Sequence, residues 1–430
     1  MNNLFNKVKK SFLLLLLFFL FFPYCNPEKD QNENMIITKW RMWSEGTKLR
    51  GVNIWQKKID PELDEDFIGR GKFGPTFTVD DFKKLSELGV NYVNISHPGI
   101  FTEDPPYLIN PEALLNLKSL VEMIGKADMF AVISLRTGPG RSEYTFYYGE
   151  DYQSDPDNGW FDEKYYNEKV WESFEIQSAW VSMWEKTAEE FKNNPYVVGY
   201  DLMVEPNSAE IFFDISEPDE FFPKYEGTTY DWNNFFPGIV EGIREVDIST
   251  PVIVGGQSYS DLEWLPYTKI ISDERIIYSF HQYSPFRYTH QNSDDGLTYP
   301  GTFDIDRDGV PEKIDREWLL GYLSAISDFM DRSGKITAAN EYGGVRFAPG
   351  IKDFFDDEMN EFERFGINYA IWEWSTSYEL FRREIHEFNF MMGTDPSNRD
   401  DIDDNPLLKV LKKYWSKNIR RPSNTDFIYE

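Results

Sequence analysis

The sequence predicts an α/β fold, a single (β/α)8 TIM barrel with long active-site loops. Eight short apolar runs, rich in Val, Ile and aromatic residues, follow one another from residue 48 onward. They lack a polar–apolar alternation, which is typical of parallel strands buried on both faces. Amphipathic helical patterns separate most of them, and neither an internal repeat nor a second-domain linker breaks the order. One barrel with insertions therefore accounts for a chain of 430 residues.

The strand predictions rest on these eight runs. In chain order, the expected strands are 49–55, 90–96, 130–136, 197–206, 251–256, 276–283, 336–343 and 368–374. The main alternative is an open doubly wound sheet, which usually carries a Gly-rich phosphate loop after its first strand. The segment GVNIWQKK stands in that place and contains no such loop. The barrel is therefore favoured.

The helix predictions rest on amphipathic patterns between the strands. The first pattern ends in Gly89, a C-capping residue, and the second begins with Pro111, which is favoured in a first helical turn. The connection after Gln257 is weak and interrupted by Pro. The expected helices are 79–89, 111–127, 168–193, 231–246, 316–332, 353–365 and 406–416.

Long segments follow the third, fourth and sixth strands, at 141–167, 207–235 and 284–315. In a (β/α)8 barrel such loops form the rim of the active site. The first of them is rich in aromatic residues, some of which we expect to serve as binding platforms. The alternative is that most of them only pack within the loop. Its aromatic cluster consists of Tyr144, Phe146, Tyr147, Tyr148, Tyr152 and Trp160.

The N-terminus predicts export. Lys7, Lys9 and Lys10 precede the apolar stretch 12–22, which has the order of a secretory signal and is too short for a comfortable membrane span. Cys25, the only Cys, follows directly. The stretch resembles a bacterial lipoprotein signal, in which such a Cys is lipidated. The alternative is a cleaved signal in which Cys25 has no role.

The expected organisation follows from this reading. Residues 1–25 are expected to form a signal peptide, of lipoprotein type if Cys25 is lipidated, residues 26–40 a polar tether, and residues 41–420 the barrel domain. The protein is expected to be secreted or lipid-anchored at the bacterial cell envelope, with Cys25 as the membrane attachment.

The composition restricts the class of partner. The formal net charge is -30, which argues against nucleic acid, because phosphates would be repelled. Aromatic residues make up 17% of the chain, and their ring faces suit sugars. A neutral ligand such as a sugar is compatible with this composition. The alternative is that the charge reflects only a well-solvated acidic surface.

Polar residues stand at the ends of several expected strands. Glu205 ends the fourth run, His281 and Tyr283 the sixth, and Glu341 lies in the seventh. Active sites of such barrels lie at the C-terminal ends of the strands. Two carboxyl groups that face each other across the mouth are the machinery of glycoside hydrolysis.

These motifs resemble glycoside hydrolase family 5, the cellulase-type members of clan A, over residues 48–417. The matches are VEP at Glu205, His-x-Tyr at His281 and Tyr283, NEYGG at Glu341, and Trp372 on the eighth strand. The resemblance implies that Glu205 is the acid/base and Glu341 the nucleophile. It also implies that Tyr283 hydrogen-bonds the nucleophile, and that catalysis needs no cofactor.

The resemblance further implies that Trp372 forms the floor on which a sugar ring stacks. Trp374 is the alternative for this role.

The chain departs from the family pattern at three positions. Val204 replaces the Asn before the acid/base, Asn94 replaces an Arg of the second strand, and Arg136 replaces a His of the third. The sequence therefore predicts a divergent member. We expect Asn94, His97 and Arg136 to support the site, with Arg136 placing a positive charge beside the nucleophile. The alternative is that Arg136 only anchors its loop, against Glu143.

An acidic motif, DIDRDGVPEKID, is independent of the barrel. Its spacing is that of an EF-hand loop without a flanking helix pair, and it predicts a structural Ca²⁺ site. The alternative is an acidic surface turn. The expected ligands and turn residue are Asp304, Asp306, Asp308, Gly309, Glu312 and Asp315.

Taken together, the sequence predicts a retaining β-glycosidase that acts on a β-linked glucan or a related glycan in polysaccharide catabolism. One alternative is a non-catalytic carbohydrate-binding surface lipoprotein on the same barrel. Another is a clan A mannosidase or glycolipid hydrolase.

Overall fold

The computed structural model describes residues 35–59, 72–143, 166–376 and 386–428, and its main compact unit spans residues 36–430. Cys25, the signal and most of the tether lie outside the described residues, as does the aromatic cluster of 144–160. Among the helices that the structure describes, none is long and apolar enough to cross a membrane.

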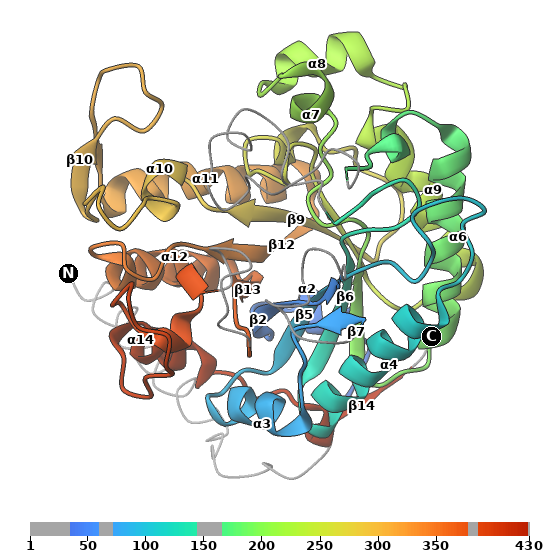
Figure 1. Cartoon of the computed structure of the whole chain (residues 1–430), viewed down its shortest axis with the longest axis horizontal. Coiled ribbons are helices and arrows are strands. Elements are labelled where there is room, and N and C mark those ends of the chain that lie inside the picture. Colours follow the sequence, from blue (N-terminus) through green and yellow to red (C-terminus); the bar gives the residue numbers. More distant parts are fainter. Residues whose placement is uncertain (1–34, 60–71, 144–165, 377–385, 429–430) are drawn as a thin grey trace, which may run out of the picture. The chain divides into compact units, whose positions relative to one another are not determined.

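Eight parallel strands close into a barrel in the order β12–β13–β2–β5–β6–β7–β8–β9, with helices around them (Figure 1). The predicted (β/α)8 fold is confirmed. The barrel strands are β2 (Arg50–Trp55), β5 (Tyr92–His97), β6 (Phe130–Leu135), β7 (Val197–Asp201), β8 (Val252–Gly255), β9 (Ile276–Gln282), β12 (Ile336–Gly343) and β13 (Asn368–Trp372).

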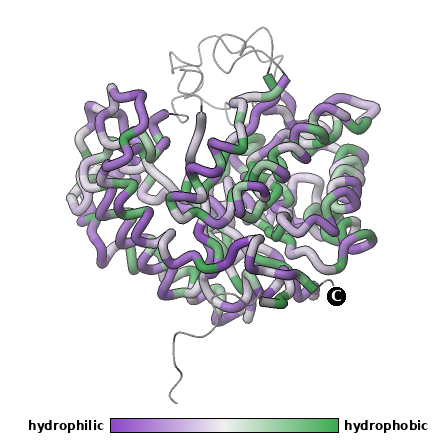
Figure 2. The backbone as a smooth tube through the Cα atoms, turned by 90° about the horizontal axis from the view of Figure 1, so that it is seen from below, coloured by the Kyte–Doolittle hydropathy of each residue, from purple (hydrophilic) through white to green (hydrophobic). Residues whose placement is uncertain are grey.

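All of the outer helices except α12 start at a residue whose side chain accepts a hydrogen bond from the first turn, such as Thr78, Asn110 and Asn405. Hydrophobic and hydrophilic residues alternate along them in Figure 2, as expected for helices that bury one face. The outer helices are α3 (Val79–Glu87), α4 (Pro111–Lys126), α6 (Phe174–Phe191), α9 (Trp232–Val246), α11 (Arg316–Ser333), α12 (Ile351–Phe365) and α14 (Pro406–Trp415).

The connection after β8 is the weak one, as the sequence indicates: it contains only the 3-10 turn η4 (Leu265–Tyr267). The rim segments hold short elements that the periodicity did not reveal. They are α7 (Ala209–Phe213) and α8 (Pro218–Tyr225) after β7, and α10 (Phe286–Thr289), β10 (Gly301–Phe303) and β11 (Glu312–Ile314) after β9. The β3 (Lys57–Lys58)–β4 (Phe73–Gly74) hairpin follows β2.

The barrel interior has an apolar part and a polar part. The short helix α2 (Arg41–Ser44) places Met42 and Trp43 among inward residues such as Tyr92 and Val198. Strand β1 (Met35–Ile37) pairs with β14 (Thr425–Phe427).

Farther along the same strands, the inward residues become polar. Because successive residues of a strand face opposite sides, the residue two positions after Tyr92 again points inward, and it is Asn94. This polar layer lies between the apolar part and the C-terminal strand ends, where the candidate site is found.

Candidate active site

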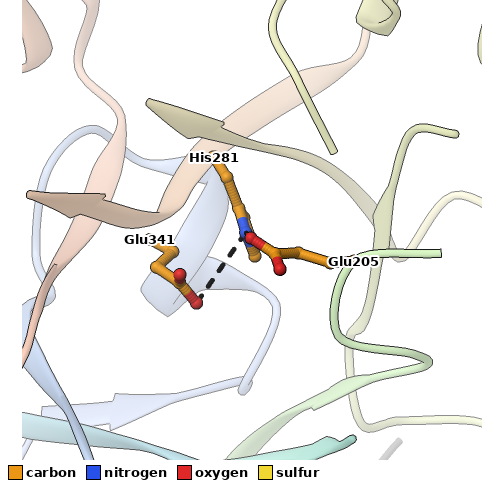
Figure 3. A group of neighbouring side chains, drawn as sticks. All are labelled: Glu205, His281 and Glu341. Carbon is orange, nitrogen blue, oxygen red and sulfur yellow. Dashed lines mark hydrogen bonds and ion pairs between the residues drawn. The ribbon is translucent and has the colours of Figure 1, made fainter. Parts of the chain in front are cut away.

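Glu205 does not lie on a strand. β7 ends at Asp201, five residues before the predicted end at residue 206, and Glu205 sits in a turn with φ 52°. This left-handed conformation costs about 1–2 kcal/mol for a residue with a Cβ, so the surrounding structure must stabilise it. The Glu205 side chain is 15% exposed and points into the mouth (Figure 3).

Arg141 holds this turn. Its guanidinium donates to the backbone carbonyls of Arg136 (3.1 Å), Val204 (2.7 Å) and Glu205 (2.9 Å). It is buried, and its Nε lies 3.6 Å from Oε1 of the buried Glu168. This role of Arg141 is not among the sequence-based predictions. The signal that could have revealed it is an Arg within the Gly- and Pro-rich loop TGPGRSE, where a guanidinium can bind several backbone carbonyls at once.

Glu341 is aimed by an irregularity in β12. Opposite β9, Ala339 pairs with Phe280 and Glu341 with His281, so Asn340 is an additional residue in the register. In a regular strand Asn340 and Glu341 would face opposite sides. The bulge lets both point inward, Asn340 into the barrel and Glu341 into the mouth.

One imidazole lies between the two carboxyl groups (Figure 3). His281 Nδ1 lies 2.9 Å from Glu205 Oε1 and 3.7 Å from Glu341 Oε2. The hydroxyl of Tyr283 donates to Glu341 Oε1 over 2.5 Å. One oxygen of each Glu and a ring nitrogen of His281 all lie within 4.8 Å of one another.

The three groups influence one another's protonation. Burial raises the pKa of Glu341 to about 7, and Glu205 acts in the same direction, whereas His281, Tyr283 and Arg136 oppose it. Burial alone would lower the pKa of His281, but the Glu341 and Glu205 carboxylates outweigh it and raise that pKa to about 9. His281 is therefore cationic at neutral pH.

Arg136 directly follows β6 and lies close to Trp372 and Trp55. Its Nε donates to Ser96 Oγ over 2.9 Å, and the guanidinium carbon lies 5.5 Å from the ring centroid of Trp372 and 5.8 Å from that of Trp55. It also favours the ionised form of Glu341, since it acts to lower the pKa of that carboxyl. Glu143 accepts a hydrogen bond from Trp55 Nε1 over 2.7 Å.

The structure corrects the expectation for His97. Asn94 and Ser96 of β5 point into the barrel, so the alternation turns His97 to the outside. There His97 Nε2 lies 2.9 Å from Oδ1 of Asn116 on α4, and burial lowers the pKa of its imidazole to about 4. It takes no part in the mouth.

Two further expected residues lie away from the carboxyl groups. Asn94 is inside the barrel, hydrogen-bonded to Asn53 over 2.6 Å. Trp374 packs against Phe77 and Phe82, with ring centroids 5.6 and 6.2 Å away. Trp372, the last residue of β13, stays the better placed of the two Trp residues for the floor of the site.

The acidic motif forms the loop of the β10–β11 hairpin. Only Asp304, Asp306 and Asp308 bring carboxylate oxygens within 4.8 Å of one another. Glu312 instead accepts from the backbone of Ile305, and Asp315 caps α11. The Ca²⁺ site stays a prediction. Three of the five expected acidic ligands lie close enough to one another to share an ion.

A comparison with known proteins identifies the family of this chain. The family model described as cellulase (glycosyl hydrolase family 5) matches residues 47–377. The chain belongs to glycoside hydrolase family 5. It is thus a glycoside hydrolase whose catalysis requires no cofactor and whose substrate is a carbohydrate.

Individual relatives are distant. Endoglucanase C of Acetivibrio thermocellus is 21% identical over 340 residues, which cover 73% of this chain and 88% of the relative. An endoglycoceramidase of Hydra vulgaris is 22% identical, with 49% of this chain and 47% of the relative covered. A solved hyperthermophilic endo-beta-1,4-glucanase shares the fold with a TM-score of 0.58 at 18% identity, covering 88% of this chain and 100% of that one.

Replacing Arg141 by Met should destabilise the protein by about 3–5 kcal/mol, because it leaves buried Glu168 beside an uncharged side chain. The midpoint of urea unfolding measures the loss. The double variant Arg141→Met/Glu168→Gln should recover part of it. An unchanged midpoint in the single variant would show that the guanidinium does not stabilise this turn.

Replacing Arg136 by Met should move the acidic limb of the pH profile of kcat/KM to higher pH. The reason is that Arg136 favours the ionised form of Glu341, which must be the anion to react. Arg136→Lys, which keeps the charge, is the control. A limb that stays in place in the Met variant would assign Arg136 to loop anchoring alone.

Proposed function

We propose that this glycoside hydrolase is a retaining β-glycosidase, with Glu341 as the nucleophile and Glu205 as the acid/base. The observation that carries the proposal is the short separation of the two carboxyl groups, whose nearest oxygens lie within 4.8 Å. Retaining enzymes hold their carboxyl groups about 5–5.5 Å apart, whereas inverting enzymes need about 6.5–9.5 Å to admit a water molecule between them and the sugar.

The contacts of the two Glu residues support this division of roles. Burial raises the pKa of Glu341, but the Tyr283 hydroxyl, His281 and Arg136 act against burial and favour the anion that a nucleophile needs. Glu205 is more exposed than Glu341, so it can exchange protons with a leaving group or with water.

The reaction then takes two steps. A carboxylate oxygen of Glu341 attacks the anomeric carbon while the glycosidic C–O bond breaks, and Glu205 gives its proton to the leaving oxygen. In the second step Glu205 takes a proton from water, whose oxygen attacks the same carbon and releases Glu341. Two inversions restore the β configuration.

For the substrate, we propose a β-linked glucan or a related glycan. The relatives named endoglucanase support a glucan. Trp372 ends β13 on the side of the barrel where the carboxyl groups lie, which suits a residue of the sugar-binding floor. The similarity to an endoglycoceramidase keeps a glycolipid as the second candidate. The predicted export would place the enzyme where such polymers occur.

Glu341→Gln should abolish turnover, since an amide cannot form the glycosyl-enzyme. Glu205→Ala should leave slow activity on aryl glycosides with good leaving groups, and azide should accelerate it, because azide attacks the intermediate without a general base. Release of the aryl group measures both effects. Full activity of either variant contradicts the assignment of its residue.

A substrate panel of β-glucans, mannans and glycolipids should show hydrolysis of a β-glucan, with the β anomer as the first product seen by NMR. An α anomer as first product would contradict the retaining mechanism. Binding to the panel without hydrolysis would instead support the alternative of a non-catalytic carbohydrate-binding protein.

A further inference from the structure

A chain of buried polar side chains crosses the barrel beneath the candidate site. It joins five strands, and each of its members is at most 3% exposed. Only one of them can ionise, and the proposed mechanism does not use it. In order of contact, the members are Asn53 of β2, Asn94 of β5, Ser134 of β6, Asp201 of β7 and Asn340 of β12.

The direction of the hydrogen bonds is fixed at one end of this chain. Asn53 Nδ2 lies 3.1 Å from the carbonyl oxygens of both Asn340 and Ala370, which can only accept. Asn53 Oδ1 therefore faces Asn94 and accepts from its Nδ2 over 2.6 Å.

The remaining bonds follow from that end. Asn94 Oδ1 is an acceptor, so the hydroxyl of Ser134, 2.5 Å away, must donate to it. Asp201 Oδ2 lies 3.0 Å from the same Ser134 oxygen and accepts from Asn340 Nδ2 over 2.7 Å. A hydroxyl has only one hydrogen, and that of Ser134 is already used for the bond to Asn94. A hydrogen bond between Ser134 and Asp201 therefore requires a hydrogen from Asp201.

We propose that Asp201 is a positioning residue that carries a proton in the resting enzyme, donates it to Ser134 and holds Asn340. Because Asn340 is the bulge residue next to Glu341, Asp201 fixes the backbone that aims the nucleophile. The effect on catalysis rests on the function proposed above; the proton on Asp201 does not.

The charges around Asp201 agree with a neutral acid. Burial raises the pKa of Asp201 to about 7, and Glu341 acts in the same direction, whereas His281 and the hydrogen bond from Asn340 oppose it. Ser134 would oppose it only as a donor to Asp201, and its one hydrogen already goes to Asn94. The titratable groups that face it are thus His281 of β9 and Glu341 of β12. On the neighbouring strands β6 and β8, the residues in register with it are Ser134 and Ile253. A neutral Asp201 adds no third negative charge beside the catalytic pair.

The test compares Asp201→Asn with Asp201→Ala. Asn imitates the size and the neutral charge of the protonated acid, and with its oxygen in the place of Oδ2 it still accepts from Asn340. Asp201→Asn should keep kcat within about threefold and leave the acidic limb of the kcat/KM profile in place. Asp201→Ala should lower kcat about tenfold or more with little change in KM. If Asp201→Ala does not fold, Asn340→Ala removes the same bond and should give the same loss.

Stability against pH provides a second readout. The folded-state pKa of Asp201 is raised above the unfolded one, so wild type loses stability as pH rises from about 4 to 7. Asp201→Asn lacks this loss, so its melting temperature relative to wild type should rise between pH 4.5 and 7.5. Glu358→Gln is the matched control. Glu358 on α12 is also fully buried with a pKa raised by burial, but it lies outside the site. Its replacement should leave kcat unchanged.

Infrared spectroscopy detects the proton without any substrate. The wild-type spectrum at pH 5.5 should contain a protonated-carboxyl band that Asp201→Asn lacks. Identical spectra in this region would overturn the assignment of the proton to Asp201. The same holds if the acidic limb of the kcat/KM profile moves to lower pH in Asp201→Asn, because that shift would mean that the substitution removed a negative charge. Wild-type kcat in Asp201→Ala would overturn the positioning role. If wild type hydrolyses nothing, the proposed function fails, while the spectra and melting curves still decide the proton.

Discussion

The structure of the site depends on one electrostatic constraint: two carboxyl groups must lie within 4.8 Å of each other in a largely buried mouth. Two negative charges this close strongly disfavour the ionisation of both carboxyl groups. One group must therefore hold a proton, and the other needs a positive charge nearby. His281 supplies the counter-charge, because the carboxylates outweigh its burial and keep it cationic. Arg136 adds a second positive charge, and Tyr283 a hydrogen bond to Glu341. In our account Asp201 stays neutral, so it adds no third negative charge beside these two carboxyl groups.

Placing the two groups this closely requires irregular backbone. Glu205 is held in a left-handed turn by a buried Arg141 that donates to three carbonyls, and Glu341 is turned inward by the bulge at Asn340. Both irregularities cost free energy. Buried side chains stabilise them: Arg141 holds the turn at Glu205, and Asp201 binds Asn340 in the bulge. The hydrogen bonds of Arg141 and of the buried polar chain are thus a part of the site, since without them the carboxyl groups would lie elsewhere.

The sequence predicted the barrel well because buried parallel strands and amphipathic helices leave strong periodic signals. It also indicated that Glu205, His281 and Glu341 come together at one end of the barrel, although β7 ends at Asp201, before Glu205. It failed where a residue's direction depends on register. His97 follows two inward residues of β5 and therefore faces α4, and Trp374 turns away to pack on aromatic residues of the shell. Asp201 was visible as a carboxyl inside an apolar run, but only the three-dimensional contacts distinguish it from Glu205.

The central claim is that Glu341 forms a covalent bond to the sugar, and it can be tested by trapping that bond. A 2-deoxy-2-fluoro glycoside with a good leaving group should form a long-lived glycosyl-enzyme, because the fluorine slows hydrolysis of the intermediate more than its formation. Intact-mass spectrometry followed by peptide mapping then locates the sugar. The account predicts one sugar per chain on the peptide that contains Glu341, and none in Glu341→Gln. A label on Glu205, or turnover of the unmodified substrate with no adduct at all, would contradict it.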